Sequence, residues 1–199
     1  MMRRLVLWDL MTLDGFFEGP RKWDLAFHEV AWGPELEAYS LAQADEIGVL
    51  LFGRVTCEGM AAHWAQADGP IADFMNGVEK VVVSTTLEEA TWENTRLLSA
   101  NVADEVRRMK AAEDGSMGDV ASTGDIFVFG SAELAATLLD AGLVDEVRLG
   151  LVPVVLGSGT PLFKAGRSPL HMDPVESRPL GPKCTLLRYH VPRGETREA

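Results

Sequence analysis

Cysteine, histidine and long apolar runs are all scarce in this 199-residue sequence. The two cysteines, Cys57 and Cys184, share no CxxC spacing, so they do not form a disulfide framework. The four histidines are scattered and form no HExxH motif, so we expect no metal site. Asp9 interrupts the first apolar run far short of a signal-peptide core or a membrane span. The sequence therefore predicts a cytoplasmic protein.

Positive charge is also in short supply. The chain has 18 Lys and Arg against 30 Asp and Glu, which gives a formal net charge of −12. Such a surface repels phosphate backbones and disfavours a nucleic-acid partner. It still permits a phosphate-bearing cofactor, because a local arginine and backbone N–H groups can override the overall field.

Two common nucleotide-binding motifs are missing. No GxxxxGK[ST] motif occurs in the sequence. The segment GSGT at 157–160 resembles the start of a dinucleotide fingerprint, but it lacks the third glycine and precedes Pro161 instead of a helix. These two absences disfavour an ATPase loop and a conventional Rossmann site.

Strand-like and helix-like patterns alternate along most of the chain, which predicts an α/β sheet. The expected strands cover 3–10, 47–52, 78–84, 95–99, 126–130, 144–155, 170–177 and 183–191. The expected helices begin at Pro34 and Arg54 and cover 101–112 and 131–143, and residues 11–33 form a long irregular connection. Gly181-Pro182 between the last two strands favours an antiparallel hairpin. Because no linker interrupts the pattern, we predict one domain over residues 1–199.

Three strand ends carry residues suited to binding phosphate. They are Gly53-Arg54-Val55-Thr56, Ser84-Thr85-Thr86 and Gly130-Ser131-Ala132-Glu133. Glycine allows close backbone approach, a helix start offers free N–H groups, and arginine can bind a phosphate through two donors. Each segment alone is better explained by ordinary turn chemistry. Ligands bind beyond the carboxyl ends of strands in such sheets, so the three together predict a nucleotide site.

Five sequence motifs occur in an order that is characteristic of one protein family. They are LDG (13–15), LLFGRVTCEGM (50–60), VVVSTTL (81–87), IFVFGSAELAATLLDAGLVDEVRL (126–149) and PVVLGSGTPLF (153–163). In this order the chain resembles the reductase domain of bacterial riboflavin biosynthesis, the RibD C-terminal type, which is grouped with dihydrofolate reductase. The resemblance implies a three-layer α/β fold with a mixed, mostly parallel central sheet of about eight strands and flanking helices. It also implies a homodimer.

The resemblance further implies NADPH as the cofactor and assigns residues to it. Gly53, Arg54 and Thr56 would hold phosphate, and Ser84, Thr85 and Thr86 would lie near the adenosine 2′-phosphate. The pyrophosphate and nicotinamide side would be cradled by Gly130, Ser131, Ala132, Glu133 and Leu134. Gly157 and Gly159 would line the loop near the nicotinamide ribose.

The implied activity is hydride transfer from NADPH to a small heterocyclic substrate that is pyrimidine-dione, pterin or flavin-like. It extends to 5-amino-6-(5-phosphoribosylamino)uracil reduction. A carboxylic acid would supply the proton. Asp14, which matches the LDG aspartate, is the first candidate and Asp9 the second; a turn role for Asp14 and a strand-capping role for Asp9 are the alternatives. Trp23, Trp32 and Trp64 either stack on a flat ring or pack structurally.

The sequence also departs from its relatives. Where many of them have GRRTYE, this chain has GRVTCE at 53–58, and it contains no HxE…PCxxC deaminase motif. Arg21, Lys22 and Lys164 are the candidates for binding a substrate phosphate. The alternative functions are a non-catalytic module that binds NADPH or a heterocycle, and a dimeric scaffold with an empty site.

Overall fold

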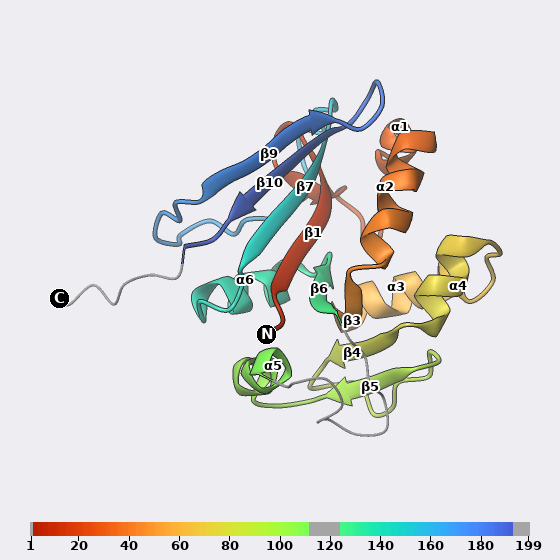
Figure 1. Cartoon of the computed structure of the whole chain (residues 1–199), viewed down its shortest axis with the longest axis vertical. Coiled ribbons are helices and arrows are strands. Elements are labelled where there is room, and N and C mark those ends of the chain that lie inside the picture. The colour runs from red at the N-terminus through yellow and green to blue at the C-terminus, as the bar shows by residue number, and fades with distance from the viewer. Residues whose placement is uncertain (1, 112–123, 193–199) are drawn as a thin grey trace.

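The computed structural model describes residues 2–111 and 124–192 of the chain (Figure 1). Within these ranges eight strands form one sheet, and two short strands form a second. The strands of the large sheet are β1 (Leu5–Thr12), β3 (Ile47–Gly53), β4 (Glu79–Val83), β5 (Thr95–Leu98), β6 (Asp125–Phe129), β7 (Glu146–Val152), β9 (Asp173–Pro179) and β10 (Thr185–His190). The small sheet pairs β2 (Phe16–Glu18) with β8 (Thr160–Pro161).

The large sheet has the order β5-β4-β3-β6-β1-β7-β10-β9. Its first six strands in this order run parallel to one another, whereas β10 runs antiparallel to both β7 and β9. The predicted mixed, mostly parallel sheet and its late antiparallel hairpin are confirmed. β3 reads as an unbroken apolar run because both of its faces are covered, as is usual for central parallel strands.

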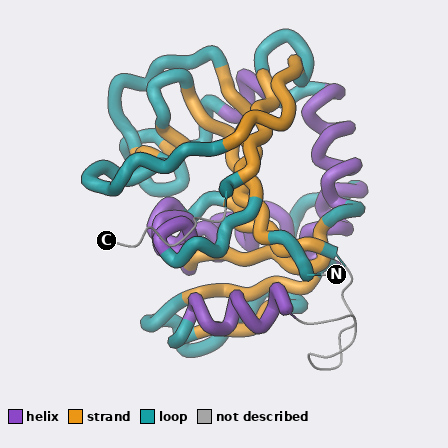
Figure 2. The backbone as a smooth tube through the Cα atoms, turned by 60° about the vertical axis from the view of Figure 1, so that its left-hand side comes forward, coloured by secondary structure: helices purple, strands orange, loops and turns teal. Residues whose placement is uncertain are grey.

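Helices cover both faces of the sheet (Figure 2). They are α1 (His28–Ala31), α2 (Pro34–Ala44), α3 (Arg54–Trp64), α4 (Pro70–Gly77), α5 (Val102–Ala111) and α6 (Ala132–Asp140). One face packs against Leu36 of α2, Cys57 of α3 and Met75 of α4. The opposite face packs against Val106 of α5 and Leu138 of α6. The result is the three-layer arrangement expected from the alternating pattern.

Most elements begin and end within a few residues of their predicted bounds. Pro34 is the first residue of α2, where its missing N–H costs no helical hydrogen bond. The sequence does not predict α4, which is short and begins at a proline after Gly69. The prediction of an irregular connection over 11–33 is wrong in part, because β2 and α1 lie within it. No helix in the described part of the chain is long and apolar enough to cross a membrane.

The sheet order brings the predicted strand ends together. β4 pairs with β3, β3 with β6, and β6 with β1, all in parallel. The carboxyl ends of these four strands therefore lie side by side at one edge of the sheet, where a ligand site is expected.

Candidate functional site

A cleft with a volume of about 710 Å³ opens at the carboxyl ends of β3, β4 and β6. We call it the strand-end cleft. Three chain segments that are far apart in sequence meet there. The predicted residues that line it are Gly53, Arg54, Thr56, Ser84, Thr85, Thr86, Ser131, Ala132, Glu133 and Leu134. The lining also includes Lys22, Trp23, Thr160 and Lys164.

Ser131 joins two of these segments. Its hydroxyl accepts a hydrogen bond from the Gly53 N–H at 2.7 Å and shares another with the Thr56 hydroxyl at 2.8 Å. A side chain on Gly53 would come within 2.8 Å of that hydroxyl, so glycine is required for the approach. Ser131 has a φ of +62°, a left-handed conformation that is uncommon outside glycine. Strain of this kind is characteristic of ligand-binding turns.

Two helices begin at the strand-end cleft. α3 starts after Gly53 and α6 starts after Ser131, and neither of these N-cap residues forms a side-chain capping bond to its helix. The first N–H groups of both helices are therefore left for other acceptors, and the helix dipoles favour an anion. Arg54 adds a guanidinium, which the structure pairs with Glu58 at 3.0 Å on the exposed side of α3.

Three predicted glycines lie outside the lining of the strand-end cleft. Gly130 lies behind it, where a Cβ would come within 3.1 Å of the Thr56 methyl group. The Gly157 N–H donates to Asp14 Oδ2 at 2.7 Å. Gly159 packs against the backbone carbonyl of Glu18, with no room for a side chain.

Asp14 has an exposed carboxylate that stabilises a loop. Its Oδ1 accepts from the Thr12 hydroxyl at 2.6 Å and from the Leu156 N–H at 3.3 Å, and the Gly157 N–H binds its Oδ2. The hydrogen bond from the Thr12 hydroxyl, followed by those from the backbone, lowers the pKa of Asp14 below its ordinary value. Asp14 is therefore ionised near neutral pH and unsuited to donating a proton.

Asp9 lies in the opposite environment. Its side chain is buried, and its Oδ1 accepts from the Gly130 N–H at 2.9 Å. Within residues 2–111 and 124–192, the buried Oδ2 has no hydrogen-bond partner. Burial raises the pKa of Asp9 well above its ordinary value, against the lowering effect of the Gly130 N–H. Asp9 can therefore hold a proton at a pH where an exposed carboxyl has lost it.

Asp9 opens into a small recess of about 160 Å³, which we call the inner recess. Its lining includes His28, Trp32, Met60 and Trp64. The Nε2 atom of His28 is also buried and has no hydrogen-bond partner among the described residues. Burial lowers the pKa of His28 to about 4, so this imidazole is uncharged at neutral pH. Two residues that line the recess, Asp9 and His28, thus each have a buried polar atom without a hydrogen-bond partner among the described residues.

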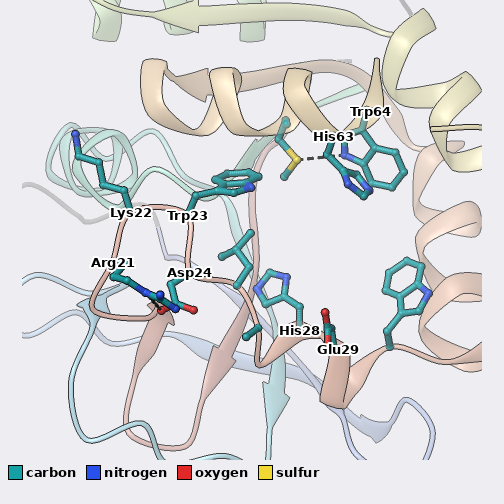
Figure 3. Close-up of a pocket in the computed structure, with 12 residues that line it drawn as sticks. Arg21, Lys22, Trp23, Asp24, His28, Glu29, His63 and Trp64 are labelled. Atoms are coloured by element: carbon teal, nitrogen blue, oxygen red, sulfur yellow. Dashed lines mark hydrogen bonds and ion pairs between the residues drawn. The ribbon is translucent and has the colours of Figure 1, made fainter. Parts of the chain in front are cut away.

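A wider pocket of about 940 Å³ shares lining residues with both of these cavities, and Figure 3 shows residues that line it. It is lined by Trp23, Trp32 and Trp64, and we call it the tryptophan pocket. It shares Lys22 and Trp23 with the strand-end cleft, and it shares His28, Trp32, Met60 and Trp64 with the inner recess. All three tryptophans singled out in the sequence therefore border one cavity.

Sequence reasoning missed His28. The residue is the first of the four-residue helix α1, which is too short to show a helical period in the sequence. His63, in contrast, is exposed and lines the tryptophan pocket. No group of three or more His, Cys, Asp or Glu side chains within the described ranges is arranged to hold a metal ion.

Comparison with known proteins identifies relatives over nearly the whole chain. A family model described as the RibD C-terminal domain matches residues 4–186. The uncharacterized protein YyaP of Bacillus subtilis (strain 168) is 28% identical over 196 residues, which cover 94% of this chain and 95% of YyaP.

Solved structures share the fold at low sequence identity. A protein named for riboflavin biosynthesis from Shewanella sp. PV-4 superposes with a TM-score of 0.76 at 20% identity, covering 97% of this chain and all of that one. The Thermotoga maritima diaminohydroxyphosphoribosylaminopyrimidine deaminase/5-amino-6-(5-phosphoribosylamino)uracil reductase gives 0.62 at 15% identity, covering 96% of this chain but 57% of that one. Enterococcus faecalis dihydrofolate reductase, complexed with NADP(H), gives 0.57 at 13% identity, with coverages of 94% and 95%. The predicted dihydrofolate reductase-like fold is confirmed.

Proposed function

The chain belongs to the RibD C-terminal domain family, and from this premise we propose that it is a reductase that transfers hydride from NADPH to a small heterocyclic substrate. One observation carries the proposal. A cleft suited to an anionic dinucleotide shares lining residues with a tryptophan-lined pocket, and that pocket shares lining residues with a recess beside a buried acid.

The strand-end cleft fits the cofactor in charge and shape. The uncapped starts of α3 and α6 would bind its pyrophosphate, with Gly53 and Ser131 allowing close approach. Arg54 and the hydroxyls of Ser84, Thr85 and Thr86 lie at the same cleft and would bind the remaining phosphate. When bound, NADPH supplies the hydride from its nicotinamide.

Asp9 is the residue we propose as the proton source, in preference to Asp14. Its carboxyl group is buried and has a raised pKa, as a general acid requires, and its Oδ2 faces no partner among the described residues. The Gly130 N–H fixes the other oxygen. Asp9 is thereby tied to the turn that begins α6, which brings the acid to the junction between cofactor and substrate.

Titration with NADPH tests the cofactor site, followed by the fluorescence of the bound cofactor. Arg54→Ala removes the only guanidinium among the described residues that line the strand-end cleft, and we expect binding to weaken by about tenfold to a hundredfold. Ser131→Trp places a bulky ring between the two helix starts and should abolish binding. Thermal unfolding of each variant checks that it remains folded.

Arg107→Ala is the matched control. Arg107 lies on α5, is paired with Asp104 at 2.8 Å and does not line the strand-end cleft. This variant should bind NADPH as the parent does. Parental affinity in both Arg54→Ala and Ser131→Trp would mean that the cofactor site is misplaced. Loss of NADPH absorbance in the presence of dihydrofolate, flavins and pyrimidine-diones then distinguishes a reductase from a non-catalytic binding module.

A further inference from the structure

We propose that the tryptophan pocket takes a flat, uncharged heterocycle that carries no phosphate, and that this ring turns a polar edge toward the inner recess. The inference rests on the proposed function, because it names the substrate class of the same site. It departs from the phosphoribosyl compound in the name of the Thermotoga maritima enzyme.

Trp23 is held as a fixed ring at the entrance to the tryptophan pocket. Its φ of +61° lies in the left-handed region, which is a strained conformation for an aromatic residue. Its backbone N–H donates to Glu18 Oε1 at 2.5 Å, and its ring lies directly over Gly59, where there is no room for a Cβ. Strain that the surroundings maintain in this way is typical of ligand clamps. Because Trp23 also lines the strand-end cleft, it stands where substrate and cofactor would meet.

Further flat surfaces line the same pocket. Figure 3 shows His63 and Trp64 at the end of α3, with His28 and Glu29 facing them across the opening. Trp64 donates from its indole N–H to the Met60 sulfur at 3.3 Å, a contact that helps to orient the ring. Trp32 is 51% exposed and also lines the cavity. One exposed and two half-buried tryptophans around one pocket indicate a stacking site for a planar ring.

The charges around the tryptophan pocket do not suit a phosphate. Among its described lining residues the cations are Arg21 and Lys22. Arg21 has an 85% exposed side chain and is paired with Asp24 at 3.2 Å, and the Lys22 side chain extends away from His28 and Trp64 (Figure 3). The carboxylate of Glu29 lines the same cavity. A phosphate needs charge-assisted donors, and here it would face carboxylates instead.

The inner recess suits the polar edge of a heterocycle. Its volume of about 160 Å³ is too small for a whole ring system but admits the edge of one. Asp9 and His28 both line it, and the buried atoms Asp9 Oδ2 and His28 Nε2 have no protein partner in the part of the chain that the structure describes. A ring nitrogen or carbonyl would satisfy them, and buried polar atoms of this kind strongly favour such a partner.

Riboflavin and FMN provide the test, because they share one ring system and one side chain and differ only in a phosphate. Each is titrated into the full chain without NADPH, and stacking on tryptophan is detected as quenching of the flavin fluorescence. We expect riboflavin to bind roughly tenfold more tightly than FMN. Equal or tighter binding of FMN, or no binding of either flavin, would overturn the inference.

Two variants on the exposed rim sharpen the result without disturbing the core. Trp32→Ala should weaken riboflavin binding by about tenfold, because it removes one stacking surface. Phe163→Ala is its matched control, since Phe163 is an exposed aromatic residue that does not line the three cavities. Glu29→Lys replaces a carboxylate of the pocket with a cation, so it should narrow the difference in affinity between FMN and riboflavin. Unchanged riboflavin binding in Trp32→Ala would show that the ring lies elsewhere.

A separate NADPH titration of the same samples distinguishes the two proposals. If NADPH binds but neither flavin does, the substrate class is wrong and the reductase proposal stands. If riboflavin is preferred over FMN while NADPH fails to bind, the ring preference stands and the reductase proposal fails.

Discussion

Buried polar side chains at the two ends of the central parallel strands differ in whether all of their polar atoms have partners. At the amino ends lie Arg4, Glu46, Glu146 and Arg148, which together form an ion-pair network. Glu146 is fully buried and Arg148 is 1% exposed. Arg148 binds both Glu146 and Glu46 at 2.7 Å, and Arg188 reaches Glu146 at 2.8 Å. Every charge in this network has an opposite charge at hydrogen-bonding distance.

Near the carboxyl ends, two polar side chains each have a buried atom without a partner among the described residues. Asp9 has one bound and one unbound oxygen, and the Nε2 of His28 has no partner in the described ranges. Leaving such atoms unpaired costs stability, so a protein retains them where a ligand completes their bonding. The difference matches two roles for buried polarity: the ion pairs at the amino ends link parts of the fold, and we propose that the groups at the carboxyl ends bind a substrate.

Asp9→Asn should separate these roles most strongly. Replacing the acid with an amide removes the proposed proton donor, and we expect turnover to fall by about a hundredfold to ten-thousandfold. Stability should not fall. The folded-state pKa of Asp9 is raised above the ordinary 3.8, so ionisation destabilises the parent progressively as pH rises from 3.8 through the folded-state pKa. Asparagine avoids this cost. Turnover of the parent should decrease as pH rises through the raised folded-state pKa, where the acid loses its proton.

Steady-state rates across pH, together with urea unfolding at matched pH values, measure both effects. Asp14→Asn is the comparison variant, because Asp14 is exposed and hydrogen-bonded within a loop. If Asp14→Asn lost turnover while Asp9→Asn retained it, the assignment of the acid would be reversed.

Glu146→Gln should have the opposite effect: the protein should lose stability and keep its affinity for NADPH. Burial alone would raise the pKa of Glu146, but hydrogen bonds from Arg188 and Arg148 hold it below its ordinary value. Removing the carboxylate leaves Arg148 buried with fewer partners, and we expect a loss of about 3–5 kcal/mol in the free energy of unfolding. NADPH affinity of the folded fraction should be unchanged. Urea unfolding measures the loss.

Glu176→Gln is the control for Glu146→Gln. Glu176 pairs with Arg178 and Arg188 but is only half-buried, so its loss should cost less than about 1 kcal/mol. Similar losses of unfolding free energy in the two variants would show that burial does not determine how much an ion pair of this network contributes to stability.

The sequence predicts the strand-end cleft well because each of its segments carries a local signal. Gly53-Arg54 and Gly130-Ser131 each end an apolar strand and begin a helix, and parallel pairing then places them together. The sequence carries no comparable local signal for choosing between Asp14 and Asp9 as the acid. The surroundings of Asp9 depend on packing between segments far apart in the sequence, since residues of α1, α2, α3 and α4 line the recess beside it, and no local pattern encodes that packing. α4 escaped prediction because its eight residues are too few to show a helical period.

His28 provides the smallest and most specific test of the comparison. Its folded-state pKa of about 4 lies below the ordinary 6.5, so between these values the unfolded chain binds a proton that the folded chain does not. The parent should therefore lose stability as pH falls from 6.5 to 4, by on the order of 1–3 kcal/mol. His28→Phe cannot take up that proton, so its unfolding free energy should depend less on pH in this window. Parallel pH profiles of parent and variant would mean that His28 is solvated, and that the inner recess is open to water rather than reserved for a ring edge.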